Sequence, residues 1–385
     1  MLALLLALVP GAPIHPGFAH RNTAVAPPAI SAAHGRLGLT PAPTSEPVPT
    51  VVPSTNPIPA RTTPPKPVPT PVPAPARGPL TWRPPVLVSP ITLTLCNCNL
   101  YNGDIIVNLR VGQDYILKDP VVLTHSVIIH GGHNVVWIGC YVQPSSGSSP
   151  AIQMGQNAGA GGGIIHLEGI YVDGLHSVLY DGIEGGEYAS MSKPRGTLAD
   201  AMLQIENVRI DHLSGSSTVQ HQDCIQHYGG WKDLRVDHFT CQSLYQGFEL
   251  PYEDTVVAGV LSHWDIRNAN LHDEPNSTGG GMQTLIHFGD TTNGTFTATS
   301  HQQRGNLTNV YLHATQRSFN SETYPNSGSQ SLDGTVIHST INANGTITWA
   351  NTWAVFGFVT SGDPPGGDYV PRGVAGLGYV SPGYR

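Results

Sequence analysis

Short apolar runs, each broken by Gly, Asn, Asp or Ser, follow one another along the chain from about residue 90. Five of them share one pattern: an apolar residue, a variable residue, a second apolar residue and then a polar one. They are NVVWIGCYV (134–142), EGIYVDGL (168–175), ENVRIDHL (206–213), KDLRVDHF (232–239) and SHWDIRNA (262–269). Almost no stretch has the 3.6-residue period of an amphipathic helix, so the pattern predicts short β-strands.

The spacing of these runs indicates how the strands are arranged. The second apolar position recurs with separations of 34, 38, 26 and 30 residues, at Ile138, Val172, Ile210, Val236 and Ile266. Constant strands joined by loops of variable length are typical of a parallel β-solenoid, because each coil packs only on its neighbours. An immunoglobulin-like sandwich would instead place turns about every 8–12 residues. We therefore predict an all-β, single-domain right-handed parallel β-helix, with first coils in 114–132 and late coils in 306–315 and 334–341.

The first 85 residues have a different texture. Residues 1–22 begin with an apolar run that predicts a secretory signal, although no positive charge precedes it; the alternative is a merely apolar N-terminus. Residues 23–85 predict a disordered Pro/Thr-rich linker, since 17 of the 34 prolines lie between residues 41 and 85. The β-helix domain is predicted over residues 86–385, with an irregular C-terminal tail. No later apolar stretch reaches the length of a transmembrane helix, so we expect an extracellular protein, free or held at the cell surface.

Charge and cysteine content narrow the partners and the compartment. The net charge is −8, and the lack of a basic patch argues against a nucleic-acid partner. The five cysteines fit either an oxidising compartment with one free thiol or buried apolar thiols. Cys224 and Cys241 either bridge neighbouring coils or remain two thiols, and no pair of CxxC motifs suggests a structural zinc site. We expect a monomer.

The strand LRVDHFTCQS (234–243) resembles the strand-end signature WIDHCxxS of the pectate-lyase-like β-helix superfamily. The resemblance covers roughly residues 100–320 and is specific for the fold but weak for activity, because the later arginine-containing catalytic strands of the superfamily have no convincing copy here. A second pattern, His221-x-Asp223-x-x-Gln226 followed by Tyr245-Gln246-Gly247, resembles bacterial β-helix proteins that imply no firm chemistry.

Aligned positions of successive coils stack about 4.8 Å apart and form columns of side chains. If the apolar positions of each run point inward, their neighbours point outward. One predicted outward column consists of Trp137, Tyr171, Arg209 and Arg235. The next consists of Gly139, Asp173, Asp211, Asp237 and Arg267.

Three carboxylates in one column repel each other unless a cation compensates them, and Ca²⁺ accepts several carboxylate oxygens. One hypothesis is therefore a Ca²⁺ site at Asp173, Asp211 and Asp237, beside Arg209 and Arg235, with Trp137 and Tyr171 as a sugar-stacking platform. Such a site resembles that of a polysaccharide lyase, with Arg235, Asp237 and His238 as catalytic candidates. The alternatives are that each Asp is a turn residue bonded to backbone N–H groups, or that the column is an Asp–Arg surface ladder.

A second column comes from the strands CIQH (224–227), GFEL (247–250) and LIHF (285–288). It places Gln226, Glu249 and His287 at corresponding positions, with Asp223 and His221 one step upstream. Hydrolysis of a glycosidic bond uses two carboxyl groups about 5–9.5 Å apart, and Asp223 and Glu249 on adjacent coils fit that need. Here the catalytic candidates are Asp223, Glu249 and His221, and the substrate-binding candidates include Gln226, Tyr245, Gln246 and His287. The alternative is a hydrogen-bonded polar ladder.

These patterns lead to two expectations for function. The first is a secreted carbohydrate-active protein that cleaves an acidic or neutral polysaccharide, by β-elimination or by hydrolysis. The second is a non-catalytic solenoid that binds a cell-surface glycan or forms surface structure, because extended solenoid faces bind ligands without any chemistry.

Overall fold

The computed structural model describes residues 80–98, 100–145, 149–175, 181–185, 201–214, 222–226, 231–250, 263–273, 284–288, 304–314, 323–324, 330–332, 335–350 and 355–383. The chain divides into two units, Met1–Pro69 and Thr70–Arg385, and all of the described residues belong to the second. Their regular structure consists of β-strands, which confirms the all-β prediction for this part of the chain. None of the described residues forms a helix long and apolar enough to cross a membrane. The predicted signal and most of the predicted linker lie outside the described residues.

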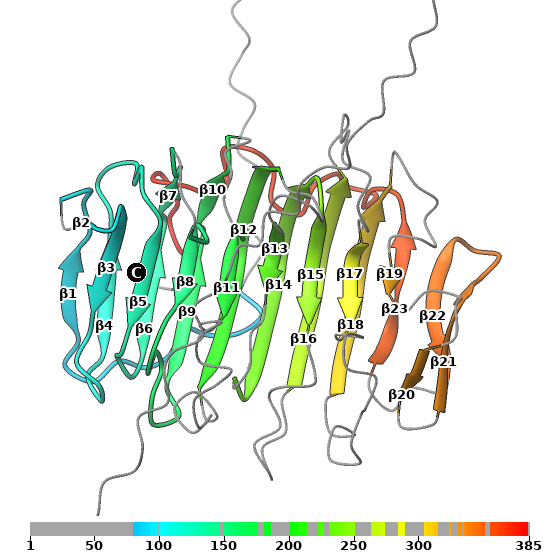
Figure 1. The fold of residues 1–385 in the computed structure, drawn as a ribbon, viewed down its shortest axis with the longest axis horizontal. Coiled ribbons are helices and arrows are strands. Elements are labelled where there is room, and N and C mark those ends of the chain that lie inside the picture. The colour runs from blue at the N-terminus through cyan, green and yellow to red at the C-terminus, as the bar shows by residue number, and fades with distance from the viewer. Residues whose placement is uncertain are drawn as a thin grey trace, which may run out of the picture. The chain divides into compact units, whose positions relative to one another are not determined.

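The described strands form two sheets (Figure 1). Sheet A runs, in spatial order, β1 (Ile91–Thr94), β4 (Tyr115–Lys118), β6 (Val135–Ile138), β9 (Ile164–Glu168), β12 (Met202–Leu213), β14 (Asp233–Ser243), β16 (His263–Asp273), β18 (Arg304–His313), β23 (Val355–Ser361), β22 (Thr346–Ala350), β21 (Thr335–Ile341) and β20 (Gln330–Leu332). In addition, β10 (Tyr171–Asp173) pairs with β12, and β7 (Tyr141–Val142) pairs with β10. Sheet B runs β19 (Thr323–Tyr324), β17 (Thr284–Phe288), β15 (Gln246–Leu250), β13 (Asp223–Gln226), β11 (Ile183–Gly185), β8 (Ile152–Met154), β5 (Val127–His130), β3 (Asp104–Asn108) and β2 (Leu100–Tyr101).

From β3 to β19 the chain passes back and forth between the two sheets, and each strand pairs in parallel with its counterpart one coil later. Apolar side chains of both sheets, among them Ile205 and Val236 of sheet A and Ile225 and Phe248 of sheet B, are fully buried in one core. Burial of this continuous apolar layer holds successive coils together. The arrangement is compatible with a β-helix-like fold. Antiparallel pairing occurs at the two ends of the described strands, between β2 and β3 and among β20 to β23.

The four long strands of sheet A bend at one aligned level. Asn207, His238, Asn268 and Asn309 have positive φ values of 55°, 47°, 45° and 55° and lie opposite one another in the register. Asn and His are among the residues that tolerate this left-handed conformation. Asn309 Nδ2 donates to Asn268 Oδ1 at 3.0 Å, and Asn268 Nδ2 donates to Asp237 Oδ1 at 2.7 Å. The bend inserts one residue into the in-and-out alternation, so the inward positions shift by one after it.

The predicted register is confirmed between β10 and β12, where Val172 lies opposite Ile210, and between β14 and β16, where Val236 lies opposite Ile266. The bend explains why it is wrong between β12 and β14. The apolar pattern places Ile210 opposite Val236, but the structure pairs Val236 with Ile205 and Ile210 with Cys241. Each long strand carries the pattern twice, once before the bend and once after it, as in LQIEN followed by VRIDH. The two copies look alike in sequence, and the predicted alignment matched the second copy of β12 to the first copy of β14.

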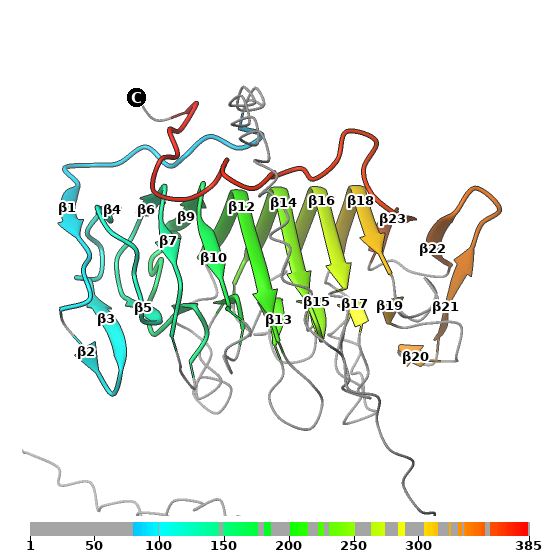
Figure 2. The ribbon, with the colours of Figure 1, turned by 90° about the horizontal axis from the view of Figure 1, so that it is seen from above.

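Two terminal segments cross the outward face of sheet A, the face opposite the core (Figure 2). The N-terminal segment (80–90) donates from Thr81 N and Trp82 N to the carboxylate of Glu206, each at 3.1 Å. The C-terminal segment (362–383) bonds to β14 through Val370 N and Thr240 Oγ1 at 3.0 Å. Residues 80–85, which the sequence assigned to the linker, therefore lie against the sheet, and packing begins before residue 86.

The cysteines resolve the alternatives left open by the sequence. Cys224 of β13 and Cys241 of β14 form a disulfide that joins the two sheets, and Cys96 is bonded to Cys98. Cys140 is a buried free thiol. The disulfides are the kind of cross-link that persists in an oxidising compartment.

Candidate functional site

A ladder of polar side chains follows the outward face of sheet B. The register places Glu184, Gln226, Glu249 and His287 opposite one another on β11, β13, β15 and β17. This confirms the predicted alignment of Gln226, Glu249 and His287, although the His287 side chain lies outside the described residues. Gln226 Nε2 donates to Glu249 Oε2 at 2.9 Å, and Gln153 Nε2 donates to Glu184 Oε1 at 2.9 Å. Each carboxylate is therefore held by an amide from the preceding coil.

Asp223 lies at the start of β13 and is completely buried. Its backbone N–H donates to Asp181 Oδ1 at 2.9 Å. Among the described residues no N–H or O–H group donates to either of its carboxyl oxygens. The carboxyl group of Glu249 is close enough to share a proton with it in a hydrogen bond. The structure therefore brings together Asp223 and Glu249, the two carboxyl groups that the sequence proposed as a pair, but in hydrogen-bond contact, which is closer than the predicted spacing of about 5–9.5 Å.

Asp181, Glu184, Asp223 and Glu249 together form what we call the sheet B carboxyl cluster. Burial, the charge of Glu249 and then that of Asp181 raise the pKa of Asp223 well above its ordinary value. Burial also raises the pKa of Asp181. Crowded carboxyl groups away from water do not all ionise, so the cluster resists full ionisation. Glu249, by contrast, is partly exposed.

Two further predicted residues border this cluster. Gln246 is almost fully buried and lies opposite Asp223 in the register of β13 and β15. Burial, followed by the charges of Asp223 and Glu249, raises the pKa of Tyr245 to about 12. Tyr245 is thus a neutral hydroxyl group at neutral pH. His221 lies outside the described residues.

Asp181 and Glu184 are cluster members that the sequence reasoning missed. A signal for them exists in DGIE (181–184), which repeats the polar-x-apolar-polar spacing of DCIQ (223–226). The register confirms the equivalence, because Ile183 pairs with Ile225 and Glu184 with Gln226.

The predicted calcium ligands do not form one column. Asp173 does lie opposite Asp211, but Asp237 lies opposite Glu206, because the register differs from the predicted one. Among the described residues these three carboxylates are not gathered within ligand distance of one another. The predicted grouping of the three is therefore wrong.

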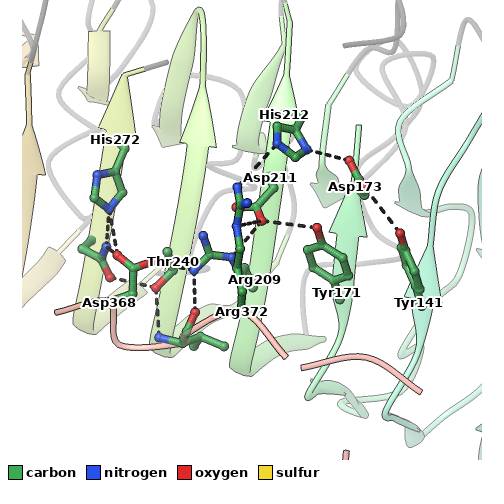
Figure 3. A network of polar contacts seen from close by, with 12 residues as sticks. Tyr141, Tyr171, Asp173, Arg209, Asp211, His212, Thr240, His272, Asp368 and Arg372 are labelled. Carbon is green, nitrogen blue, oxygen red and sulfur yellow. Dashed lines mark hydrogen bonds and ion pairs between the residues drawn. The ribbon is translucent and has the colours of Figure 1, made fainter. Parts of the chain in front are cut away.

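Arg209 and Asp211 instead belong to a buried polar network on β10, β12 and the C-terminal segment (Figure 3). Arg209 Nε bonds to Asp211 Oδ2 at 2.9 Å, and Arg209 Nη1 bonds to Asp368 Oδ2 at 2.7 Å. Tyr171 O–H donates to Asp211 Oδ2 at 3.3 Å, and Arg372 Nε lies 3.2 Å from the same oxygen. The contacts match parts of both alternatives. Arginine pairs hold Asp211, although Arg209 and Asp211 are buried rather than on the surface, and Asp173 Oδ1 accepts from the Leu175 N–H two residues on, as a turn residue does.

Asp173 has its own set of partners at the edge of this network. His212 Nδ1 lies 2.8 Å from Asp173 Oδ1, and Gln143 Nε2 donates to Oδ2 at 3.2 Å. Burial alone would raise the pKa of Asp173, but bonds from His212, the Leu175 N–H and Gln143 lower it below its ordinary value. Asp173 therefore remains charged inside a satisfied network.

The other residues of the predicted lyase site are engaged by the terminal segments. Arg235 and Arg267 lie over the Trp82 ring, 5.8 and 5.1 Å from its centroid. Asp237 is fully buried and accepts hydrogen bonds from Thr81 Oγ1 and from Asn268. His238 occupies the left-handed position of the bend, and its Nδ1 lies 3.1 Å from Asp237 Oδ1. These contacts join sheet A to its covering segments.

The predicted stacking platform is wrong for Trp137, which is fully buried in the core and donates from Nε1 to Asp119 Oδ2 at 2.8 Å. In β6 the residues facing the core are Val135 and Trp137, the opposite of the predicted alternation. Tyr171 is half-buried and packs on Tyr141, with the ring centroids 4.8 Å apart.

The chain matches no protein-family model, no curated protein and no solved structure. What can be said of its chemistry rests on the geometry above.

Proposed function

We propose that the second unit is a right-handed parallel β-helix of the pectate-lyase-like kind. Support comes from the alternation of strands between two parallel sheets, from the buried core between them and from the aligned Asn positions at the bend. Right-handed crossovers are the strong preference for parallel strands in one sheet.

We further propose that the protein is a glycoside hydrolase, with its reaction centre at the sheet B carboxyl cluster. The observation that carries this proposal is the contrast between two neighbouring carboxyl groups. Asp223 is buried, has its pKa raised by burial and by the charge of Glu249, and accepts no hydrogen bond from a described donor, whereas Glu249 is partly exposed and held by the Gln226 amide. Pairs whose surroundings separate their pKa values commonly act as acid and base.

In this reaction Asp223 donates its proton to the glycosidic oxygen as the bond to the anomeric carbon breaks. Glu249 supports the other half of the reaction, either by attacking the anomeric carbon or by taking a proton from the attacking water, once the bound substrate has separated the two carboxyl groups to about 5–9.5 Å. Water adds across the broken bond, and Asp223 is reprotonated by the end of the cycle.

The charge of the cluster favours one class of substrate. The ionised carboxyl groups of the cluster would repel a uronate, so we propose a neutral polysaccharide. Elimination from a uronate has weaker support, because the predicted cation ligands are separated and Arg235 lies on Trp82. The Cys224–Cys241 disulfide supports an extracellular location.

The test is to incubate the purified full chain with neutral and acidic polysaccharides and to measure new reducing ends and unsaturated uronates separately. We expect reducing ends from a neutral polymer, without unsaturated products. Asp223→Asn and Glu249→Gln should each lower kcat/KM by about 100-fold or more. The control is Asp265→Asn, a partly exposed carboxylate on sheet A that should leave the rate unchanged.

Three results would contradict the proposal. Unsaturated products would indicate a lyase, and unchanged rates in both cluster variants would place the chemistry elsewhere. Retention of a polysaccharide without cleavage would favour the glycan-binding alternative.

A further inference from the structure

Side chains from β16, β18 and the C-terminal segment meet on the outward face of sheet A, away from the sheet B carboxyl cluster. They are His272, His313 and Asp363, and one donor atom of each lies within 4.8 Å of the others. His272 and His313 are direct neighbours in the register of β16 and β18. All three side chains are partly exposed, so an ion from solvent could reach them.

The two imidazole rings face the same carboxylate oxygen. His313 Nδ1 lies 2.7 Å from Asp363 Oδ1, and His272 Nδ1 lies 3.6 Å from it. A tetrahedral ion with bonds of about 2.0–2.1 Å holds its ligand atoms about 3.3 Å apart. The two observed separations bracket that value, so small side-chain movements would complete the geometry.

A second carboxylate supports the ring of His272 from its far side. His272 Nε2 lies 3.0 Å from Asp368 Oδ1, and Asp368 also accepts from Arg209 and Asn270. A carboxylate at this distance can accept a hydrogen bond from a proton held on His272 Nε2, which leaves the Nδ1 lone pair of His272 for a ligand. Metal-bound histidines typically have such a carboxylate partner.

Without a metal, the contacts of His272 also fit the tautomer that carries its proton on Nδ1. In that tautomer Nε2 accepts a hydrogen bond from Asn270 Nδ2 at 2.7 Å. An ion at Nδ1 would select the tautomer that donates to Asp368.

We propose that His272, His313 and Asp363 bind one divalent transition-metal ion, with Zn²⁺ as the first candidate. Imidazole nitrogen suits zinc and its neighbours in the first transition row, whereas Ca²⁺ takes oxygen ligands. Three protein ligands leave a fourth position for water. The ion ties the C-terminal segment to β16 and β18 at the point where that segment leaves β23. The proposal is independent of the hydrolase proposal, since it involves different residues on the other sheet.

The test is calorimetric titration of ZnCl₂, and separately CaCl₂, into the full chain, expressed without a histidine tag and treated with a chelator. We expect one zinc ion per chain and no comparable calcium binding. Asp363→Asn and His313→Ala should each weaken zinc binding by about tenfold or more, a range typical of altered metal sites. The matched control is His263→Ala, because His263 lies on the same strand β16 and its Nδ1 is 3.2 Å from Asp233 Oδ1. Among the described residues this pair is not part of a group of three metal-ligating side chains. The affinity of His263→Ala for zinc should equal that of the wild type.

Zinc should also raise the melting temperature of the wild type and of His263→Ala but not that of Asp363→Asn. If His313→Ala does not fold, Asp363→Asn still decides, because it changes one oxygen of a partly exposed side chain. The proposal is overturned if the wild type takes up no zinc, or if Asp363→Asn binds zinc as tightly as the wild type does.

Discussion

Arg209 is a buried cation between two carboxylates, Asp211 and Asp368. Replacing it with Met would leave Asp211, which is fully buried, without its closest guanidinium. Breaking a buried ion pair from one side costs about 3–5 kcal/mol, so Arg209→Met should lower the free energy of unfolding by roughly that amount. Urea unfolding measures the change.

The control is Arg267→Met, because Arg267 also pairs with an aspartate, Asp265, but its side chain is 37% exposed. Exposed pairs contribute about 1 kcal/mol or less. Equal costs for the two variants would show that the network around Arg209 does not stabilise the fold.

Glu206 gives a prediction for pH. Burial, followed by the charge of Asp237, raises its pKa to about 8, despite the backbone N–H groups of Trp82 and Thr81. Between its ordinary pKa and about 8 the folded protein holds a proton that the unfolded chain releases. The free energy of unfolding should therefore be greatest near the lower end of this window and fall, on the order of a few kcal/mol, as pH rises to about 8.

Unfolding of the wild type and of Glu206→Gln at pH 5 and pH 9 tests this. Gln cannot ionise, so the variant should lose less stability than the wild type over the same interval. A loss of the same size in both proteins would assign the pH dependence to other groups.

At the residue scale, the sequence predicts correctly which residues lie opposite one another where the strands have a clear start. DCIQ and QGFEL begin at the same level of sheet B, so Asp223, Gln226 and Glu249 could be aligned correctly. Trp137 could not be placed, because a run such as NVVWIGCYV is apolar at consecutive positions and does not show which side faces the core. The contacts of Glu206 and Asp237 with residues 81 and 82 carry no local signal, because they join positions far apart in sequence.

At the scale of elements, the Cys224–Cys241 disulfide links β13 to β14 across a sequence separation of 17 residues. A bridge that closes a loop of this length stabilises a protein by about 3 kcal/mol, chiefly by restricting the unfolded chain. The double variant Cys224→Ala/Cys241→Ala should therefore unfold with a free energy about 3 kcal/mol lower. Urea unfolding of the oxidised protein and of the variant measures this.

Treating the wild type with a reductant under the same conditions is the control, and it should lower stability to a similar degree. If neither change has an effect, the bridge contributes little beyond the packing of the two buried sulfur atoms.

The existence of the strands could be predicted, whereas their register could be predicted only in part, correctly between β14 and β16 but not between β12 and β14. Apolar runs of the right length mark β12, β14 and β16 in the sequence. The one-residue bend at Asn207, His238 and Asn268 is invisible to a pattern of period two, because the apolar alternation resumes immediately after it. The register is instead determined by the stacking of the bends on one another. The predicted column of metal-binding and lyase residues is wrong because the sequence did not reveal this stacking.

At the scale of the whole molecule, the N-terminal segment covers part of sheet A. Its contribution to stability can be measured by comparing two truncated proteins, one that begins at residue 80 and one that begins at residue 91, because they differ only in this segment. In the shorter chain the buried carboxyl group of Glu206 loses the hydrogen bonds from the N–H groups of Thr81 and Trp82. Asp114 likewise loses the hydrogen bond from the N–H group of Val88. Since each unsatisfied buried group costs about 1–3 kcal/mol, the melting temperature of the shorter chain should be several degrees lower.

Thermal unfolding of the two chains by circular dichroism measures the difference. Equal melting temperatures would mean that the segment lies on the sheet without stabilising it. A third protein, which begins at residue 80 and carries Trp82→Ala, keeps the backbone hydrogen bonds but loses the Trp82 ring that contacts Arg235 and Arg267. Its melting temperature separates these two contributions.

The two terminal segments also have a consequence for the order in which a newly made chain matures. Thr81 bonds to residues 125 and 156 positions later, and Tyr379 donates to Glu168, 211 positions earlier. Coils stack through contacts between neighbours, which form early, whereas contacts so distant in sequence must wait. Trp82 therefore stays uncovered during synthesis until β14 and β16 have been made. A chain that stops after β23 lacks the partners Tyr379 and Asp368, so Glu168 and Arg209 gain these contacts only after the C-terminal segment has been made.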